Sequence, residues 1–275
     1  MTDLKQLIAP DDLDLIRPDE KLWLKSIFKR LNGYPNLEQI WMLMDEIWQD
    51  LECNPEIIDL RIDKYYSHPV WLLNGLFAEQ HEQSLINRRG FAEWVCAQKP
   101  ERVADYGGGF GTLARMIGEI CPNTEVHIIE PYPHQLAIER VKNFKNVSYK
   151  KALEGKYDIL IATDIFEHVV DPLALVAETA KSLKLGGKYL IANCFYPVIL
   201  CHLPQCFHFR YTWHRAMEKM GLQIDKNILY GAVFLYKNNL DLKAARKIEL
   251  RSQKLWKLIK NLHRYFQRIL VRILI

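Results

Sequence analysis

Hydrophobic positions along the chain follow a helical spacing first and an alternating strand and helix pattern afterwards. Between residues 17 and 100, apolar residues recur every three or four positions. Pro18-Asp19-Glu20 favours a helix start, because proline suits the first position and acids suit the first turn. Asn36, followed three residues later by Gln39, is typical of a capping box. A further helix is predicted over 69–94, so residues 1–100 form a helical region that we expect to serve as a substrate lid or an oligomer contact.

The pattern changes at Arg102, where short apolar runs begin to alternate with helical ones. Strands are predicted at 102–106, 125–130, 147–150, 157–162 and 188–192, and helices at 112–120, 133–142, 171–183 (closed by Gly186-Gly187) and 211–220. Strands 222–225 and 228–236 are joined by a turn at Lys226-Asn227 that is too short for a parallel crossover. The sequence therefore predicts an α/β fold in residues 101–238, a doubly wound seven-stranded, mostly parallel sheet that ends in an antiparallel hairpin.

The tail, residues 239–275, has the pattern of a basic amphipathic helix. Its apolar face is formed by Ile248, Leu255, Leu258, Ile259, Leu262, Tyr265, Phe266, Ile269 and Ile273, and its basic face by Lys254, Lys257, Lys260, Arg264, Arg268 and Arg272. Such a helix can pack on the protein's own N-terminal helices, form a coiled coil, or lie on an anionic membrane surface. No nucleic-acid-binding fold accompanies the charge, so we expect no nucleic acid partner.

Composition fits a protein of the cytoplasm. The 275 residues are 49% hydrophobic and 25% charged, which is ordinary for a globular chain. The net charge of +4 is uneven, because residues 241–275 carry +8 and the remainder carries −4. The six cysteines include no CxxC pair, which favours a reducing compartment. Without a targeting pattern or a long apolar span, we expect a cytoplasmic location with peripheral contact to the inner membrane surface through the tail.

A glycine-rich turn follows the first predicted strand and supplies the candidate ligand site. Asp105 is followed by Gly107, Gly108, Gly109 and Gly111, and a helix begins at Thr112. Glycines let backbone N–H groups approach a ligand closely, and a strand, glycine turn and helix form a nucleoside cradle in doubly wound sheets. The spacing is GxGxG, whereas nicotinamide and flavin enzymes more often carry GxGxxG.

Residues 102–237 resemble the class I S-adenosylmethionine-dependent methyltransferases. The glycine turn matches their DxGxGxG loop, and Glu130 closes the second strand, where that family places an acid. The run from Tyr157 to Pro172 looks like the family's FD-x-V-x-x-x-DVLEHV-x-DP signature. The resemblance implies S-adenosylmethionine as the cofactor.

The resemblance also implies roles for individual residues. Asp105 would meet the amino group of the cofactor, directly or through water, and Glu130 would accept the ribose hydroxyls, with Pro131 beside it. Asp164 and Ile165 would lie near the methionine moiety. Relatives often hold adenine with an acid between the third and fourth strands. Here that connection is short and its only acid is Glu154, so backbone atoms at Ala152 and Leu153 are expected to hold the adenine.

The acceptor is expected to bind at residues 193–213. Phe207 to Trp213 resembles the family's HxRxxT element, so His208 is the first candidate for the base, followed by His168 and His202, and Tyr196 is a candidate to orient the acceptor. For Glu167-His168 the alternative is a helix-start acid with a partly buried histidine. Two cysteines and two histidines lie within residues 201–208, but the paired spacing of zinc sites is missing, so no metal is expected.

Two functions remain open on this basis. The first is methyl transfer to a hydroxyl, and less so to an amine or carbon, of a small molecule, sugar or lipid-linked glycan. Base methylation in nucleic acid is disfavoured, since no (N/D)PP(Y/F) sequence follows the fourth strand. The second is a non-catalytic scaffold attached to a membrane or to a partner enzyme. The apolar helix over residues 36–51 must be sandwiched either inside its own domain or against another subunit, and the second alternative would make the protein a homo-oligomer.

Overall fold

The computed structural model describes residues 8–237 and 239–274, and for residues 10, 11 and 261–274 it describes the backbone only. The N-terminal helices are η2 (Pro10–Leu15), α1 (Pro18–Arg30), α2 (Leu37–Asp50), α3 (Leu60–Tyr66), α4 (Pro69–Ala78) and α5 (Glu82–Ala97). They are followed by β1 (Arg102–Tyr106), α6 (Thr112–Ile120), β2 (Glu125–Ile129), α7 (Gln135–Val141), β3 (Val147–Lys150), β4 (Tyr157–Thr163), η3 (Phe166–His168), α8 (Pro172–Thr179) and η4 (Ala180–Ser182). The last elements are β5 (Leu183–Ala192), η5 (Pro204–Tyr211), α9 (Trp213–Met220), β6 (Leu222–Ile228), β7 (Gly231–Tyr236) and α10 (Leu242–Leu274).

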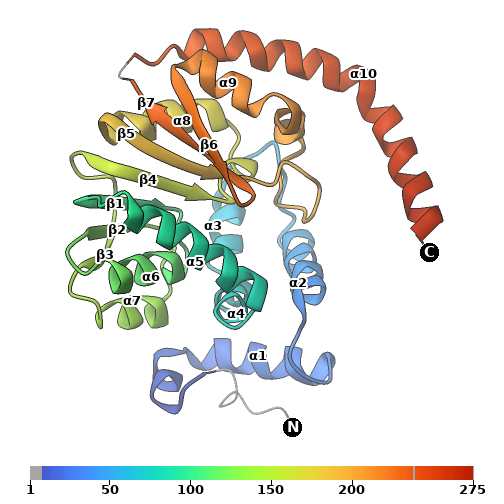
Figure 1. Ribbon diagram of the computed structural model, residues 1–275. Coiled ribbons are helices and arrows are strands. Elements are labelled where there is room, and N and C mark those ends of the chain that lie inside the picture. Colours follow the sequence, from blue (N-terminus) through green and yellow to red (C-terminus); the bar gives the residue numbers. More distant parts are fainter. Residues whose placement is uncertain (1–7, 238, 275) are drawn as a thin grey trace.

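The sheet has seven strands in the order β3-β2-β1-β4-β5-β7-β6 (Figure 1). Strands β1 to β5 pair in parallel, and β7 runs antiparallel to both β5 and β6. The predicted fold class, a mostly parallel sheet with a C-terminal antiparallel hairpin, is confirmed. The carboxyl ends of the parallel strands share one edge, which is where ligands bind in such sheets.

Helices cover both faces of the sheet, because side chains along each strand alternate between them. Val103, Ile159 and Ile161 share a core with residues of α5 and α6. Ala104 and Leu160 point the other way, into a core that α8 and α9 complete. Strands β1 and β4 are therefore buried on both sides, and Figure 1 shows α5, α6 and α7 on the opposite side from α8 and α9.

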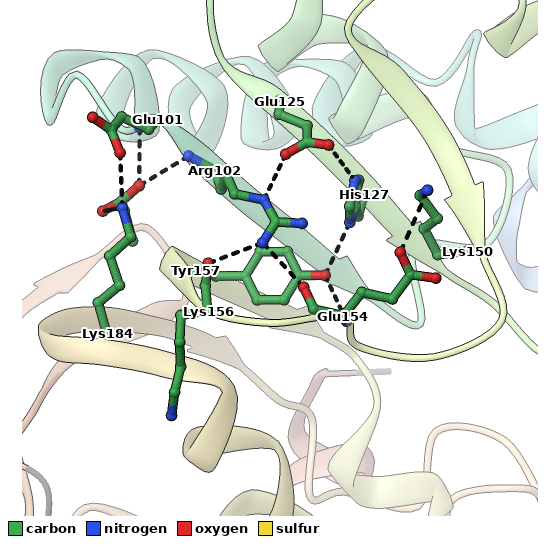
Figure 2. Close-up of polar contacts among 10 residues, drawn as sticks. Glu101, Arg102, Glu125, His127, Lys150, Glu154, Lys156, Tyr157 and Lys184 are labelled. Atoms are coloured by element: carbon green, nitrogen blue, oxygen red, sulfur yellow. Dashed lines mark hydrogen bonds and ion pairs between the residues drawn. The ribbon is translucent and has the colours of Figure 1, made fainter.

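Polar contacts tie the amino ends of the strands together at the edge opposite the glycine turn (Figure 2). Arg102 of β1 bonds Glu125 of β2 at 2.5 Å. The buried His127 ring lies between Glu125 and the hydroxyl of Tyr157, each at 2.9 Å. Asp158 accepts the backbone N–H of Arg102 at 2.9 Å. This network joins β1, β2 and β4 and serves the stability of the sheet.

The N-terminal segment 69–94, predicted as one helix, is two helices that meet at Glu79-Gln80-His81. The carboxylate of Glu79 forms ion pairs with Arg115 of α6 and Arg140 of α7. These partners are distant in sequence, so local periodicity could not show the break. Both capping predictions are correct in position: α1 begins at Pro18, and Asn36 and Gln39 exchange two hydrogen bonds of 2.9 Å.

The C-terminal strands differ from prediction in their ends. The helix after Asp171 ends at Thr179, and Gly186-Gly187, predicted to close it, lies inside β5. The hairpin turn falls at Leu229-Tyr230 rather than at Lys226-Asn227. Leu229 has a φ of 49°, a left-handed conformation that residue type alone does not suggest.

Helices α1 to α3 contact loops at the carboxyl edge of the sheet. Glu20 lies 3.2 Å from His134, in the loop after β2. Asp63 accepts a hydrogen bond from Tyr132 in the same loop, and Asp45 accepts one from the Leu200 amide at 2.6 Å, after β5. The position over this edge suits the expected lid. The division at residues 100 and 101 stays a prediction, and α5 packs directly on α6.

Helix α10 packs on α9, η5 and α8 (Figure 1). Ala245, Ile248 and Ser252 are buried, and Arg246 pairs with Asp171. Ile248 is thus part of the core, as the predicted stripe requires. Leu255 and Leu258, on the same predicted stripe, are 51% and 78% exposed. The stripe positions Leu262, Tyr265, Phe266, Ile269 and Ile273, and the basic positions Arg264, Arg268 and Arg272, lie outside the residues whose side chains are described.

Among the described residues, no helix combines the length and the apolarity needed to cross a membrane. Cys96, at the end of α5, and Cys121, after α6, are paired as a disulfide with 5.9 Å between their Cα atoms. This pair was not predicted, and it departs from the reducing compartment that the missing CxxC spacing favoured. Cys53, Cys194, Cys201 and Cys206 are free thiols.

Candidate functional site

The glycine turn between β1 and α6 has a backbone that only glycine adopts easily. Gly107, Gly109 and Gly111 have φ values of 69°, 51° and 72°. A Cβ on Gly107 would stand 2.0 Å from the side chain of Ile165, so the loop after β4 packs tightly on the turn. A Cβ on Gly109 would meet nothing within 4 Å. The turn therefore packs against protein at Gly107 and has open space beside Gly109.

Glu130 joins the end of β2 to this turn. Its carboxylate accepts the backbone N–H of Gly109 and that of Tyr132, each at 3.0 Å. Burial raises the pKa of this carboxyl. Each carboxylate oxygen can accept more than one hydrogen bond, so Glu130 can still bind a pair of hydroxyl groups. Tyr149 of β3 donates to the Gly109 carbonyl at 2.9 Å and holds the turn from the other side.

Asp105 is buried beneath the turn and is 1% exposed. Its Oδ2 atom finds no hydrogen-bond partner among the described residues. Burial raises the pKa of this carboxyl to about 7, against the opposing effect of Arg88, and Glu130 raises it further. A buried carboxylate without a partner is costly, so the position suits a ligand cation or a bridging water.

Asp164 and Ile165 follow β4, at the same edge. Asp164 has a φ of 54° and accepts a hydrogen bond from the Tyr230 hydroxyl at 3.2 Å. Its side chain is exposed to solvent. Protein groups around the carboxyl nevertheless remove part of its hydration, and this desolvation raises its pKa. Together with Asp105 and Glu130 it gives the edge an acidic character, which suits a cationic ligand.

Glu167, His168 and His202 form a cluster next to this acidic edge. One donor atom of each lies within 4.8 Å of the donor atoms of the other two. Burial, together with the nearby Asp164, raises the pKa of Glu167. Burial lowers the pKa of His168 to about 3 and also lowers that of His202. These three groups could hold a metal ion.

Aromatic side chains from α3 and the loop after β2 cover the cluster. The ring of Tyr66 is stacked on Tyr132 with 5.9 Å between centroids, and it stands edge-on to His168 at 6.5 Å. Burial strongly raises the pKa of Tyr66, and the nearby Glu167 and Glu130 add to the effect. Tyr66 is a site residue that sequence reasoning missed, because α3 is far from the sheet in the chain.

His208, the first sequence candidate for a base, is not in this cluster. It is buried, its Nδ1 lies 3.1 Å from the Ser252 hydroxyl of α10, and burial lowers its pKa to about 4. It lines a cavity of about 780 Å³ between η5, α10 and the loop at Pro55. Arg210 lines the same cavity and lies 4.1 Å from the ring of Tyr196.

Three further predicted residues lie at the rim of the sheet. Pro131 is exposed directly after Glu130. Ala152 is exposed in the loop between β3 and β4, and Leu153 packs against the large core. Their contact with a cofactor stays a prediction.

Comparison with known proteins places the chain in a family. The model of a family described as a methyltransferase domain matches residues 78–227, more than half of the chain. The chain belongs to this methyltransferase family. Membership of this family implies S-adenosylmethionine as the cofactor.

Similar proteins agree with this assignment, and similar structures share the fold. A ubiquinone biosynthesis O-methyltransferase of Thiobacillus denitrificans is 28% identical over 133 residues, which cover 44% of this chain and 56% of that protein. The chain thus spans about half the length of the curated relatives it matches. An O-methyltransferase family protein from Burkholderia thailandensis shares the fold with a TM-score of 0.53 and 12% identity, over 73% of this chain and 71% of that one. The CurJ carbon methyltransferase shares it with a TM-score of 0.55 and 11% identity, over 81% and 72%.

The residues present fit the methyl donor. The unpartnered Oδ2 of Asp105 suits its ammonium group, and Glu130 suits its ribose hydroxyls. The open space at Gly109 admits a ligand beside the backbone. Of the sequence-predicted residues, Asp105, Glu130, Asp164, Ile165 and the glycines therefore share one edge with His168 and His202.

Proposed function

We propose that this methyltransferase methylates a hydroxyl oxygen of a small molecule, a sugar or a lipid-linked glycan. The bound donor supplies a methyl carbon activated by positive sulfur, so the protein has to align the acceptor and remove its proton. The single observation that carries the proposal is the Glu167, His168 and His202 cluster beside the acidic edge. A free amine can react through its own lone pair without such a group, and the relatives named as O-methyltransferases favour oxygen.

In this proposal the acceptor hydroxyl faces His168 and His202. The two imidazoles present their Nε2 atoms to this hydroxyl, because the Nδ1 atoms already donate to backbone carbonyls. Tyr196 acts from the same loop, since its carbonyl holds His202 at 2.7 Å and its ring packs under Arg210. The cavity beside η5, with Arg210, Trp256 and Phe207 in its lining, is the proposed place for the body of the acceptor. Helices α1 to α4 act as the lid.

Incubation of the full chain with S-adenosylmethionine and a panel of phenols, catechols, sugars and lipid-linked glycans tests the proposal. Mass spectrometry should find one acceptor whose mass increases by one methyl group. The matched inactive protein is Glu130→Gln, which should bind the donor weakly and yield little product. A scaffold without activity would methylate no acceptor, and a product methylated on nitrogen or carbon would contradict the choice of oxygen.

A further inference from the structure

The cluster of Glu167, His168 and His202 is assembled from two loops at the carboxyl edge of the sheet. Glu167 and His168 are adjacent in η3, directly after β4, and His202 lies ten residues after the end of β5. Strands β4 and β5 pair in parallel, so their following loops meet at one edge. The donor atoms of all three side chains lie within 4.8 Å of one another.

The hydrogen bonds of the two histidines fix the atoms that they present. Nδ1 of His168 lies 3.1 Å from the Cys201 carbonyl oxygen, and Nδ1 of His202 lies 2.7 Å from that of Tyr196. A carbonyl oxygen only accepts, so both Nδ1 atoms carry the proton and both lone pairs are on Nε2. An imidazole held by a backbone carbonyl in this way is the usual arrangement of a metal-binding histidine.

Glu167 has a carboxylate of which only one oxygen is hydrogen-bonded within the described part of the chain. The side chain is 0% exposed, and Oε1 accepts the Cys194 backbone N–H at 2.7 Å. No residue in the described part of the chain bonds its Oε2 atom. An unpaired buried carboxylate oxygen destabilises the folded protein. A cation bound next to Oε2 would offset this loss of stability.

We propose that Glu167, His168 and His202 bind one divalent cation of the zinc type. Two imidazole nitrogens and one carboxylate oxygen are a common donor set for catalytic zinc, with a further position open to water or a substrate oxygen. Donors at ~2.1 Å from zinc in tetrahedral geometry lie about 3.4 Å apart, so the cluster closes slightly on binding.

The cysteines of the same segment take no part. The thiol of Cys206 donates to the Val169 carbonyl at 3.3 Å, and the cluster includes neither Cys201 nor Cys206. The absence of a metal was expected from the spacing within residues 201–208 alone. The partners of His202, Glu167 and His168, instead follow β4, so the proposed site replaces that expectation.

The cation site gives the cluster a defined role, which rests on the proposed function. A hydroxyl bound to a divalent cation loses its proton to solvent more easily than a free one. The oxygen lone pair then forms the bond to the methyl carbon as the carbon–sulfur bond breaks, and S-adenosylhomocysteine leaves. The two imidazoles act as ligands in this step, not as proton acceptors.

Cobalt binding to the full chain tests the site without any acceptor. Chelator-treated protein is titrated with Co²⁺, followed by the visible absorption of the bound ion, and with Zn²⁺ by calorimetry. We expect one ion per chain, and a loss of affinity of about 100-fold or more in Glu167→Gln and in His202→Asn. His202→Asn retains an N–H for the Tyr196 carbonyl, and the exposed His214→Asn is the matched control that should bind normally. Donor affinity should change by less than about threefold in either variant.

The outcomes separate this site from the proposed function. Absence of a bound-cobalt spectrum, or equal cobalt affinity in wild type and in both variants, overturns the metal site. If chelation and His202→Asn leave methyl transfer to a hydroxyl unchanged, the metal site fails and the proposed function stands. If cobalt binds with the expected losses but no hydroxyl is methylated, the site stands and the proposed function fails.

Discussion

The carboxylate of Glu130 accepts the backbone N–H of Gly109 at 3.0 Å, so the acid after β2 and the glycine turn after β1 form one unit. A ligand that reaches the open side of Gly109 also reaches Glu130. This relationship brings two distant sequence motifs, residues 105–111 and residue 130, into contact at the carboxyl edge of the sheet.

Glu130→Gln should weaken binding of S-adenosylmethionine by about 10- to 100-fold, because charge-assisted hydrogen bonds to the ribose are lost. The amide oxygen of glutamine can still accept the Gly109 N–H, so the turn should keep its shape. Calorimetric titration measures the change. Glu119→Gln, an exposed acid at the far end of α6, is the control and should leave the affinity unaltered. Equal affinities in both variants would remove Glu130 from the site.

Gly109→Ala separates backbone strain from ligand contact. Gly109 and Gly186 both have positive φ, 51° and 77°, and a Cβ would meet nothing within 4 Å at either. Alanine at either position should cost about 1–2 kcal/mol of folding free energy, measured by chemical denaturation. Only Gly109→Ala should also abolish donor binding, because its Cβ occupies the open side of the turn. Normal binding by Gly109→Ala would show that the donor lies elsewhere.

Asp105 should make the free protein less stable as the pH rises. Its folded pKa, about 7, lies above its unfolded value near 3.9, so the native state binds more protons between these limits. The free energy of unfolding therefore falls between about pH 4 and pH 7, by at most about 4 kcal/mol from this group. Asp105→Asn should remove that slope in denaturation at pH 5 and pH 8. Parallel pH profiles for the two proteins would contradict the assignment.

The tail should bind anionic membranes through the part that follows Lys260. Full-length protein is expected to float with anionic vesicles, while a chain that ends at Lys260 should stay behind. The shorter chain keeps Ala245, Ile248 and Ser252 in place against the domain, so its thermal stability should be similar. A chain that ends at Leu240 would lose these contacts and is a poor control. Equal flotation of the long and short chains would count against a membrane role.

The sheet was predictable because β1, β2 and β4 are apolar runs at regular distances, each followed by turn residues. The position of Asp105, Glu130 and Asp164 at one edge of the sheet was predictable, because these acids directly follow or end those runs. Tyr66 and the partnership of His202 with Glu167 were not, since nothing local in α3 or in the loop after β5 marks a tertiary contact. The break between α4 and α5 at Glu79 was not predictable for the same reason, because the two arginines that pair with Glu79 belong to other helices.

The most direct test of the account follows the methyl group itself. Full-length protein is given S-adenosylmethionine labelled with carbon-13 in the methyl group, together with the acceptor found in the panel, and the product is read by carbon NMR. The account predicts a labelled methyl on oxygen, formed by the wild type and largely lost in Glu130→Gln. A labelled methyl on nitrogen or carbon, or equal label in the two proteins, would contradict it.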